Sequence, residues 1–235
     1  MTDLLVAPCS AKASRYAVMH WHYSKTMPIG RLIRFGVWED GRFVGSVIYG
    51  RGATPQMAKH HKLKQTEFCE LVRIALDEHE TTVSKIVSET LRQLRETNPG
   101  IRLVASFADP NEGHHGGIYQ AGNWIYIGRS GEAEQVYFQG RWQHPRNANP
   151  STFGGKTAYS GLSKLTPAQR DALPRRRVPG KHRYVYPLDR GMRRRMLAQS
   201  KPYPARGEVL NGSDVPSRDV GRVRSPGTAP TEATS

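Results

Sequence analysis

The order of apolar segments is the sequence feature that most constrains the fold. Between residues 4 and 127, short apolar runs typical of strands alternate with stretches whose apolar residues recur at helical spacing. The predicted order is strand, helix, hairpin, strand, helix, strand, short helix, strand. A hairpin makes antiparallel neighbours, whereas a strand–helix–strand crossover usually makes parallel ones. The sequence therefore predicts an α/β fold with a mixed central sheet flanked by helices.

The hairpin is the best-defined part of this pattern. Glu39-Asp40-Gly41-Arg42 lies between two apolar runs, 32–38 and 43–49. An Asp-Gly pair favours a tight two-residue turn because glycine adopts positive φ without steric cost. The other strands are expected at 4–7, 68–76, 101–107 and 124–127, and the helices at 11–20, from 83 to the Asn98-Pro99-Gly100 stop, and at 118–121. Residues 51–65 are basic and irregular, which predicts a loop lying over a site.

The chain carries a large positive charge, and most of it lies in one segment. Lys and Arg number 35 against 20 Asp and Glu, which gives a net charge of +15. Residues 131–200 supply 14 of the basic and 4 of the acidic residues. Such a surplus suits a polyanionic partner, above all nucleic acid, and a solubilising basic surface is the alternative. The candidate DNA contacts are Arg175, Arg176, Arg177, Lys181 and Arg183.

Composition divides the chain into three parts. Residues 1–140 hold the predicted catalytic core. Residues 141–200 form a basic extension, in which Thr166-Pro167 starts a short helix and residues 181–186 alternate like an edge strand. In residues 201–235, Pro, Gly, Ser and Thr dominate, which predicts a disordered tail.

Apolar runs and cysteines limit the class of protein further. No apolar run is long enough to span a bilayer, so no membrane association is expected. The two cysteines, Cys9 and Cys69, exclude a disulfide scaffold and a four-thiolate zinc site. They fit a protein of the reducing cytoplasm.

The strongest candidate site follows the predicted strand at 101–107. Ligands of α/β sheets gather beyond the carboxyl ends of strands. The side chains and glycines at this strand end are Ser106, Asp109, His114, His115, Gly116 and Gly117. Glycines let backbone amides approach a ligand closely, and a helix start attracts negative charge. A purely structural glycine-rich connection is the alternative.

Four other side chains are candidates for chemistry near this turn. The Tyr119 phenol is a candidate general acid, and a buried Glu70 carboxylate with a raised pKa is a candidate base for an amine nucleophile. Arg51 and Arg73 are candidates for clamping a phosphate or a carboxylate. Core packing of the tyrosine, an ion pair between Glu70 and Arg73, and solvated surface charge are the alternatives.

A metal site is the weaker hypothesis for the histidines. His114 and His115 offer suitable ligands, and Asp109 or His22 could complete the set. Adjacent histidines rarely point into one coordination sphere, however, and no His-x-x-x-His pair supports them. A structural or hydrogen-bonding role is therefore favoured, and a metal such as iron stays open.

Several motifs, taken in order, resemble known families. Glu70-Leu71-Val72-Arg73 on a strand and Gly117–Trp124 after the next strand are similar to the GNAT acyltransferase superfamily. More specifically, the chain resembles the Mom family of phage DNA-modification proteins over residues 5–130, and more weakly over 179–184. The shared stretches are His22-Tyr23-Ser24, 38–43, 50–52, 70–73, 106–110 and 113–120.

This resemblance implies a GNAT-like transferase acting on double-stranded DNA. It implies conversion of the exocyclic amine of adenine to N6-carbamoylmethyladenine, which hides phage DNA from host restriction enzymes. It also implies catalytic roles for His22, Tyr23 and Ser24. The base must leave its stack to react. The candidates for stacking on it are Trp21, Tyr23, Trp124 and Tyr126, with core packing as the alternative for most of them.

The activated two-carbon donor stays open between acyl-CoA and charged glycyl-tRNA. GNAT enzymes that use coenzyme A carry a glycine-containing loop before the central helix, whereas this chain has Asp77-Glu78-His79-Glu80-Thr81-Thr82 there. Acidic side chains repel a pyrophosphate, and a glycyl group has the same elemental composition as carbamoylmethyl. Two other functions stay open: an N-acyltransferase for a small amine or a protein, and a non-catalytic DNA-binding protein.

Overall fold

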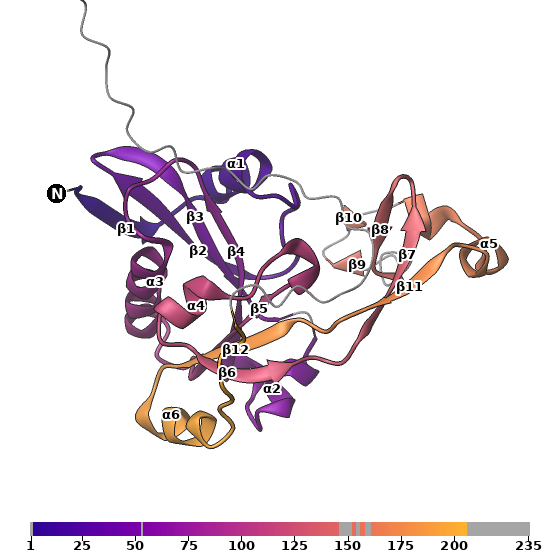
Figure 1. Cartoon of the computed structure of the whole chain (residues 1–235). Helices are drawn as coiled ribbons and strands as arrows, with labels where there is room; N and C mark the ends of the chain where they lie inside the picture. The colour runs from indigo at the N-terminus through magenta and orange to yellow at the C-terminus, as the bar shows by residue number, and fades with distance from the viewer. Residues whose placement is uncertain (1, 53, 146–151, 154–155, 158–160, 206–235) are drawn as a thin grey trace, which may run out of the picture.

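A seven-stranded mixed sheet organises the chain (Figure 1). The computed structural model describes residues 2–52, 54–145, 152–153, 156–157 and 161–205. In spatial order the strands are β1 (Leu4–Pro8), β2 (Leu32–Glu39), β3 (Arg42–Gly50), β4 (Phe68–Leu76), β5 (Leu103–Ala108), β12 (His182–Pro187) and β6 (Ile125–Arg129). Neighbours pair antiparallel except for β4 and β5, which are parallel. The predicted mixed sheet is confirmed.

The helices that the sequence predicts are present, and all of those described except α5 lie against the central sheet. The described helices are α1 (Ala11–Trp21), α2 (Gln56–His60), α3 (Val83–Thr97), α4 (Gly117–Ala121), α5 (Pro167–Asp171) and α6 (Arg190–Leu197). Two predicted helix starts are confirmed. The Ser10 hydroxyl accepts a hydrogen bond from the Ala13 amide at the start of α1, and Thr166 forms a capping box before α5. The described residues also include the 3₁₀ turns η1 (Gln65–Glu67), η2 (Pro110–Glu112) and η4 (Gly161–Lys164).

Two smaller sheets lie beyond the central one. One contains β11 (Arg175–Val178), β7 (Ala133–Phe138) and β8 (Arg141–Gln143), in that spatial order. The other pairs β9 (Thr152–Phe153) with β10 (Lys156–Thr157). Figure 1 shows the β11-β7-β8 sheet projecting to one side of the central sheet, together with α5.

The hairpin between β2 and β3 forms as the sequence predicts. Glu39 lies opposite Arg42, so Asp40 and Gly41 alone make the turn. Their φ angles are 49° and 78°. Two successive positive φ values define the hairpin turn for which an Asp-Gly pair is suited.

The two faces of the sheet bury different helices. On one face, Ile86 and Leu91 of α3 and Tyr119 of α4 pack against the central strands. On the other face, Ala17 and Val18 of α1 pack over β3 and β4. The same face is covered further along by α2 and α6, whose apolar residues pack over β5, β12 and β6. The candidate site must therefore lie at a sheet end or between helices of one face.

The segment predicted as an edge strand is an internal strand, and that prediction is wrong. β12 pairs with β5 along its whole length, from His182 opposite Ala108 to Pro187 opposite Leu103, and with β6 on its other side. The physical reason is burial on both faces: Tyr184 packs in the α3 and α4 layer, and Val185 packs in the α2 and α6 layer. A strand from the predicted basic extension thus completes the central sheet.

Other elements differ from the sequence-based expectation. Residues 51–65, expected as an irregular loop, contain α2 and η1. The arginine run 175–177 is the strand β11, and the run 193–195 lies on α6, where Met192 and Met196 face the core. Few apolar residues flank these arginine runs, so their hydrophobic periodicity is weak. The sequence therefore indicates their positive charge but not their secondary structure.

The ordered chain extends into the predicted tail. The Lys201 amide donates to the Tyr126 carbonyl oxygen at 2.8 Å, and the Tyr203 hydroxyl donates to the Trp124 carbonyl oxygen at 2.6 Å. Residues 206–235, the rest of the predicted tail, lie outside the described residues. In the described part of the chain, Cys9 and Cys69 are free, and no helix is long and apolar enough to cross a membrane.

We predict that a chain ended after Gly140 does not form this fold, whereas a chain ended after Ala205 does. Without β12, the facing edges of β5 and β6 lose every hydrogen bond they make to it, and the layer under α6 is exposed. Far-UV circular dichroism with thermal unfolding checks this. Cooperative unfolding of the shorter chain would contradict it.

Candidate active site

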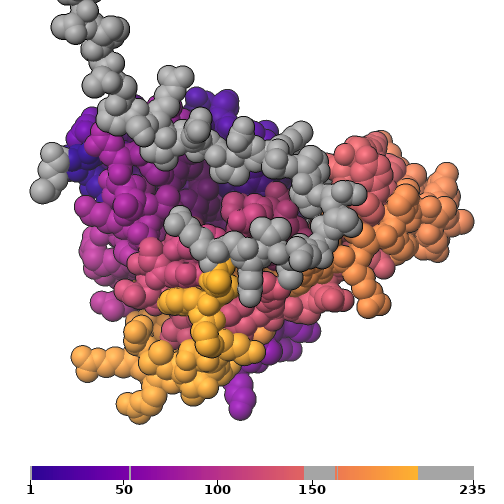
Figure 2. All heavy atoms as spheres, viewed as in Figure 1, coloured from indigo at the N-terminus to yellow at the C-terminus, as the bar shows by residue number. Residues whose placement is uncertain are grey.

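The central sheet divides between β4 and β5. These parallel strands pair only over Phe68–Glu70 and Leu103–Ala105. Beyond that point β4 continues along β3, and β5 continues along β12. In the view of Figure 2, the surface is hollowed where the purple N-terminal half meets the magenta and pink residues. A division between two parallel strands opens at their carboxyl ends, where ligands of α/β sheets gather.

A buried hydrogen-bonded group lies at this division. The Ser106 hydroxyl is 3.0 Å from the Leu71 carbonyl oxygen on β4 and 2.7 Å from the Tyr119 hydroxyl on α4. It thus links the two strands after their backbone pairing has ended. Burial raises the pKa of Tyr119 to about 12, so this phenol keeps its proton at neutral pH. The predicted acid residue is therefore protonated, but it is held inside the protein.

An irregularity in β4 lies beside the division. Tyr49 is opposite Leu71 and Ile48 is opposite Arg73, so Val72 is an extra residue in the strand. Such bulges bend a strand and turn its side chains. The Arg73 side chain donates from Nε to the Thr26 carbonyl oxygen at 3.2 Å. Arg73 thereby ties the loop after α1 to the divided strand.

His22 and Ser24 form a close pair at the end of α1. The His22 Nδ1 accepts the Ser24 amide at 3.1 Å and is 2.8 Å from the Ser24 hydroxyl. Because Nδ1 accepts an N–H, the proton of the neutral ring is assigned to Nε2. Burial, then the charges of Arg73 and His114, lower the pKa of His22 to about 4. A neutral imidazole within reach of a serine hydroxyl can take up its proton.

Tyr23 extends the same cluster toward solvent. Its ring stacks on His22 with centroids 4.3 Å apart and lies 5.9 Å from the ring of His114. Tyr23 is 65% exposed. The loop after α1 thus meets the turn after β5. In the sequence, both segments are singled out by the resemblance to the Mom family. An exposed ring at this place is suited to stacking on a planar ligand.

Asp109 is ionised and paired at the end of β5. Its carboxylate is 2.9 Å from the Lys181 ammonium and accepts two hydrogen bonds from Asn111. Burial alone would raise the pKa of Asp109, but the charge of Lys181 and the Asn111 hydrogen bonds outweigh it and lower that pKa. Lys181, a predicted DNA contact, is therefore a partner of the candidate site.

The glycine-rich turn is shaped by contacts with β12. The Tyr184 hydroxyl donates to the His115 carbonyl oxygen at 2.6 Å. Gly116 has a φ of +88°, and a Cβ there would lie 2.3 Å from the Tyr184 ring. This position needs glycine for the close approach of the ring. Gly117 follows as the first residue of α4.

Trp124 and Arg51 lie apart from this cluster, whereas the charge of Glu70 acts on Arg73 and Tyr119. Trp124 is 1% exposed and packs on Tyr119 and Tyr186, so it is not available to stack on a base. Arg51 is exposed and follows the β3 residue that pairs with Glu70. Glu70 is the last β4 residue paired with β5, so it lies at the closed end of the division.

The candidate metal ligands do not converge. Within the described ranges, no group of three or more His, Cys, Asp or Glu side chains is placed to hold a metal ion. The His114 amide donates to the Asp109 carbonyl oxygen at 3.0 Å. This hydrogen bond agrees with the preferred hydrogen-bonding role of the turn, and we derive no step through iron.

The predicted DNA-binding arginines have partners within the chain. Arg175 forms ion pairs with Glu134 at 2.6 Å and Asp171 at 3.2 Å. Arg176 donates to the Gln135 side chain and lies 4.4 Å over the Trp142 ring. Arg177 is exposed and lies 3.9 Å from Glu132. Of the other two predicted DNA contacts, Lys181 is paired with Asp109, and Arg183 donates to the Ile127 carbonyl oxygen.

A carboxylate from β2 occupies the amides just before α3. The Glu39 oxygens accept the backbone N–H groups of Glu80 and Thr81, both at 2.8 Å. Burial alone would raise the pKa of Glu39, but these hydrogen bonds outweigh it and lower the pKa below 4.5. Sequence reasoning missed this contact because the residues are far apart in the chain. It leaves these two amides unavailable to a pyrophosphate.

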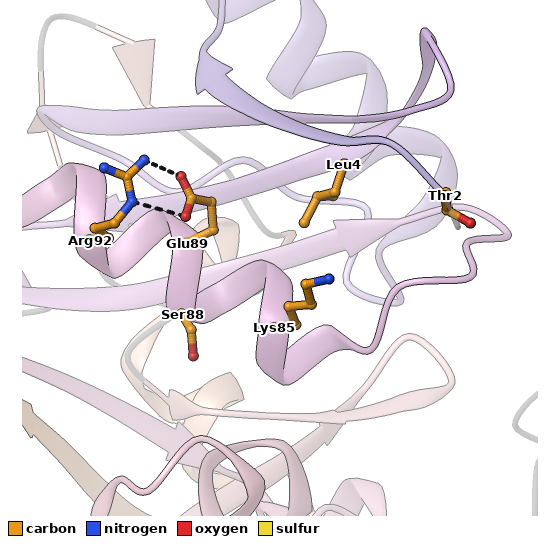
Figure 3. A pocket seen from close by; sticks show the side chains of 6 residues that line it. All are labelled: Thr2, Leu4, Lys85, Ser88, Glu89 and Arg92. Atoms are coloured by element: carbon orange, nitrogen blue, oxygen red, sulfur yellow. Dashed lines mark hydrogen bonds and ion pairs between the residues drawn. The ribbon is translucent and has the colours of Figure 1, made fainter.

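One surface hollow is unrelated to the candidate site. Its volume is about 480 Å³, and it lies between the start of the chain and α3 (Figure 3). Its lining residues are Thr2, Leu4, Lys85, Ser88, Glu89 and Arg92. Arg92 is bound to Glu89 and Glu96. None of the predicted site residues lines this hollow.

Fold and site together define a mixed α/β protein whose candidate active site lies where its central sheet divides. Solved structures with a similar fold include FeeM, an N-acyl amino acid synthase from uncultured soil microbes, at a TM-score of 0.45 and 12% identity; the match covers 85% of this chain and 95% of that one. Mutant forms of the Vibrio cholerae spermidine/spermine N-acetyltransferase SpeG match at 0.43 and 10%, over 82% and 99% of the two chains.

The chain belongs to the Mom protein family, which it matches over residues 3–205. It is 27% identical over 209 residues to a protein of Escherichia phage Mu named methylcarbamoylase mom, covering 86% of this chain and 84% of that protein. The resemblance predicted from the sequence motifs is confirmed. The relative from phage Mu is named as an enzyme, which agrees with the expectation of a transferase.

We predict that Glu39→Gln destabilises the fold by about 1.5–3 kcal/mol at neutral pH, because one charged acceptor of a buried N–H becomes an NH₂ donor. The folded pKa of Glu39 lies below its ordinary 4.5. The stability that the Glu39 carboxylate contributes is therefore fully present above pH 4.5 and is lost as the pH falls through the folded pKa. Urea unfolding at pH 7 and pH 3 measures this, with exposed Glu96→Gln as the control. An equal loss of unfolding free energy at pH 7 and at pH 3 would contradict this prediction.

Proposed function

We propose that this member of the Mom family is a transferase that converts the exocyclic amine of adenine in double-stranded DNA to N6-carbamoylmethyladenine. The observation that carries the proposal is the family match, since it spans every residue of the divided-sheet cluster. The relative from phage Mu is named a methylcarbamoylase. In a phage-infected cell the enzyme would act in the host cytoplasm and protect the modified DNA from restriction.

The cluster supplies groups suited to this reaction. Tyr23 presents an exposed ring on which a flipped adenine can stack. The Ser24 hydroxyl is half-buried and lies 2.8 Å from Nδ1 of the neutral His22, so it can pass a proton from the amine to that nitrogen. Asp109, held ionised by Lys181, is a hydrogen-bond acceptor for orienting the amine.

The donor we favour is a glycyl ester such as charged glycyl-tRNA. The amine attacks the ester carbonyl, the new N–C bond forms, and the ester C–O bond breaks. The amine proton goes to His22 through Ser24, and the released oxygen takes up a proton. The glycyl amide then rearranges to carbamoylmethyl: the bonds from the adenine nitrogen to the carbonyl carbon and from the methylene to the amino group break. Bonds from the adenine nitrogen to the methylene and from the carbonyl carbon to the amino group form, so all atoms are conserved. The Glu39 carboxylate supports this choice over acyl-CoA, because it occupies the amides before α3.

We predict that DNA from cells expressing the protein contains adenosine in which a carbamoylmethyl group replaces one amine hydrogen. His22→Gln and Asp109→Asn should lower its yield by about 10²–10⁴-fold, since each removes a positioned polar group. Matched controls are His20→Gln, on the exposed side of α1, and Asp171→Asn, in an exposed ion pair. Nucleoside mass spectrometry measures the yield.

The same measurement separates the rival functions. Unmodified adenine from a folded, well-expressed protein would favour an N-acyltransferase for a small amine or a protein. Strong DNA binding with unmodified adenine would favour a non-catalytic DNA-binding protein. Either result would overturn the proposal.

The donor has its own test. We predict that purified protein, supplied with duplex DNA and tRNA charged with labelled glycine, places the label in adenine. The control reaction contains the same labelled glycine uncharged. Modified adenine without the label would exclude the glycyl donor, and loss of the reaction on adding a chelator would favour the iron-assisted route.

A further inference from the structure

Two helices form a strongly basic surface on the face of the sheet that also carries α1. Ala58 of α2 and Met192 and Met196 of α6 pack in one apolar layer over β5, β12 and β6. Figure 1 shows the two helices together at the lower end of the molecule. Their inner sides are buried in that layer, so their polar residues face solvent. We call this outer side the α2–α6 surface.

The charge of the α2–α6 surface is of one sign. Residues 51–64 and 190–201 contain nine Lys and Arg residues and no Asp or Glu. The exposed members are Arg51, Lys59, Lys62, Lys64, Arg190, Arg193, Arg194 and Lys201. The nearest acidic residues along the chain, Glu67 and Asp189, are both paired with Arg102. The surface therefore keeps its full positive charge.

Ion pairing distinguishes the basic residues of the α2–α6 surface from the arginines of β11. Arg175 has two carboxylate partners, and Arg177 lies near a third. Among the residues that the structure describes, none of the nine basic side chains of the α2–α6 surface forms an ion pair. Cations without internal partners are the ones that can exchange counterions for phosphates.

Two buried nitrogen atoms lie beneath the surface. His61, between α2 and η1, is 7% exposed, and its Nδ1 has no hydrogen-bond partner in the described part of the chain. The Nε of Arg183 on β12 is also buried without a partner there. Burial, then the charges of His60, Arg183 and Arg195, lower the pKa of His61 to about 4. Both nitrogens are closed off from solvent, so the exposed lysines and arginines of the surface are the groups available to a ligand.

The α2–α6 surface lies on the same face of the sheet as the start of β4 and as α1. His61 stacks on Phe68, with ring centroids 6.0 Å apart. Phe68 begins β4, and two residues further along the same face is Glu70, where the sheet divides. α1, which ends at the His22 and Ser24 pair, packs on this face as well. A long polyanion lying on α2 and α6 is thereby directed toward the division.

We infer that the α2–α6 surface binds the phosphate backbone of the double-stranded DNA substrate. The inference rests on the proposed function, because it takes DNA as the substrate. Phosphate contacts set the register and orientation of a duplex, while the target base is bound elsewhere. The surface thus holds the duplex, and the exposed Tyr23 and its neighbours receive the base.

Salt dependence of binding tests the inference. The triple variant Arg190→Ala, Arg193→Ala, Arg194→Ala is compared with the wild-type chain for binding of a labelled DNA duplex by fluorescence anisotropy, with no donor present. The log–log slope of affinity against salt should fall by about 0.9 for each phosphate that the variant no longer neutralises. The matched control, Arg175→Ala with Arg177→Ala, should leave the slope unchanged. A second triple variant with Lys at the same three positions should retain most of the slope.

Each other outcome overturns the inference. An unchanged slope in the alanine variant, with its thermal unfolding also unchanged, would remove α6 from the interface. Loss of slope in the β11 control instead would move the duplex to that strand. Loss of binding to tRNA with duplex binding intact would assign the surface to RNA. The assay needs no reaction, so it is separate from the proposed function: His22→Gln should bind the duplex with the wild-type slope and give no modified adenine.

Discussion

The early end of pairing between β4 and β5 is the constraint on which the rest of the site depends. Three residue pairs join the two parallel strands, and each then follows its other neighbour. Backbone groups on the diverging edges need new partners, and Ser106 supplies one for the Leu71 carbonyl oxygen. The same divergence makes room for Tyr119 and lets the end of α1 meet the end of β5. Polar groups that are distant in the sequence therefore converge at one place.

Two kinds of positive charge coexist in the molecule. Lys181 and Arg175 each face a carboxylate, so their charge holds parts of the structure together. The cations of α2 and α6 lack such partners among the described residues and project their charge outward. Burial and neighbouring cations keep His22 and His61 neutral at pH 7. These two histidines therefore add nothing to the positive field of the lysine and arginine side chains, which stay charged at any pH near neutrality.

The sequence predicts those parts of the structure whose cause is local. The Asp40-Gly41 turn, the strand at 68–76 and the apolar stripe of α3 follow from neighbours along the chain. The basic residues of β12 resemble the pattern of an edge strand, although Tyr184 and Val185 are buried on opposite faces. In the candidate site, the family resemblance singles out the segments of Tyr23 and of His114, but the contact between their rings is seen only in the structure. The contact of Glu39 with the start of α3 is not predictable from the sequence, since it depends on how distant segments pack.

The position of β12 in the sheet has a consequence for how the protein is made. A ribosome releases β5 and β6 well before the residues that pair between them. Until then the nascent chain carries two unpaired strand edges and an uncovered apolar layer, which are features that favour aggregation. Closure of the sheet must wait for the C-terminal quarter of the chain, and long-range strand insertion of this kind is slow. Folding of the central sheet is therefore completed only after β12 has left the ribosome, and the seam between β5 and β6 stays open until then.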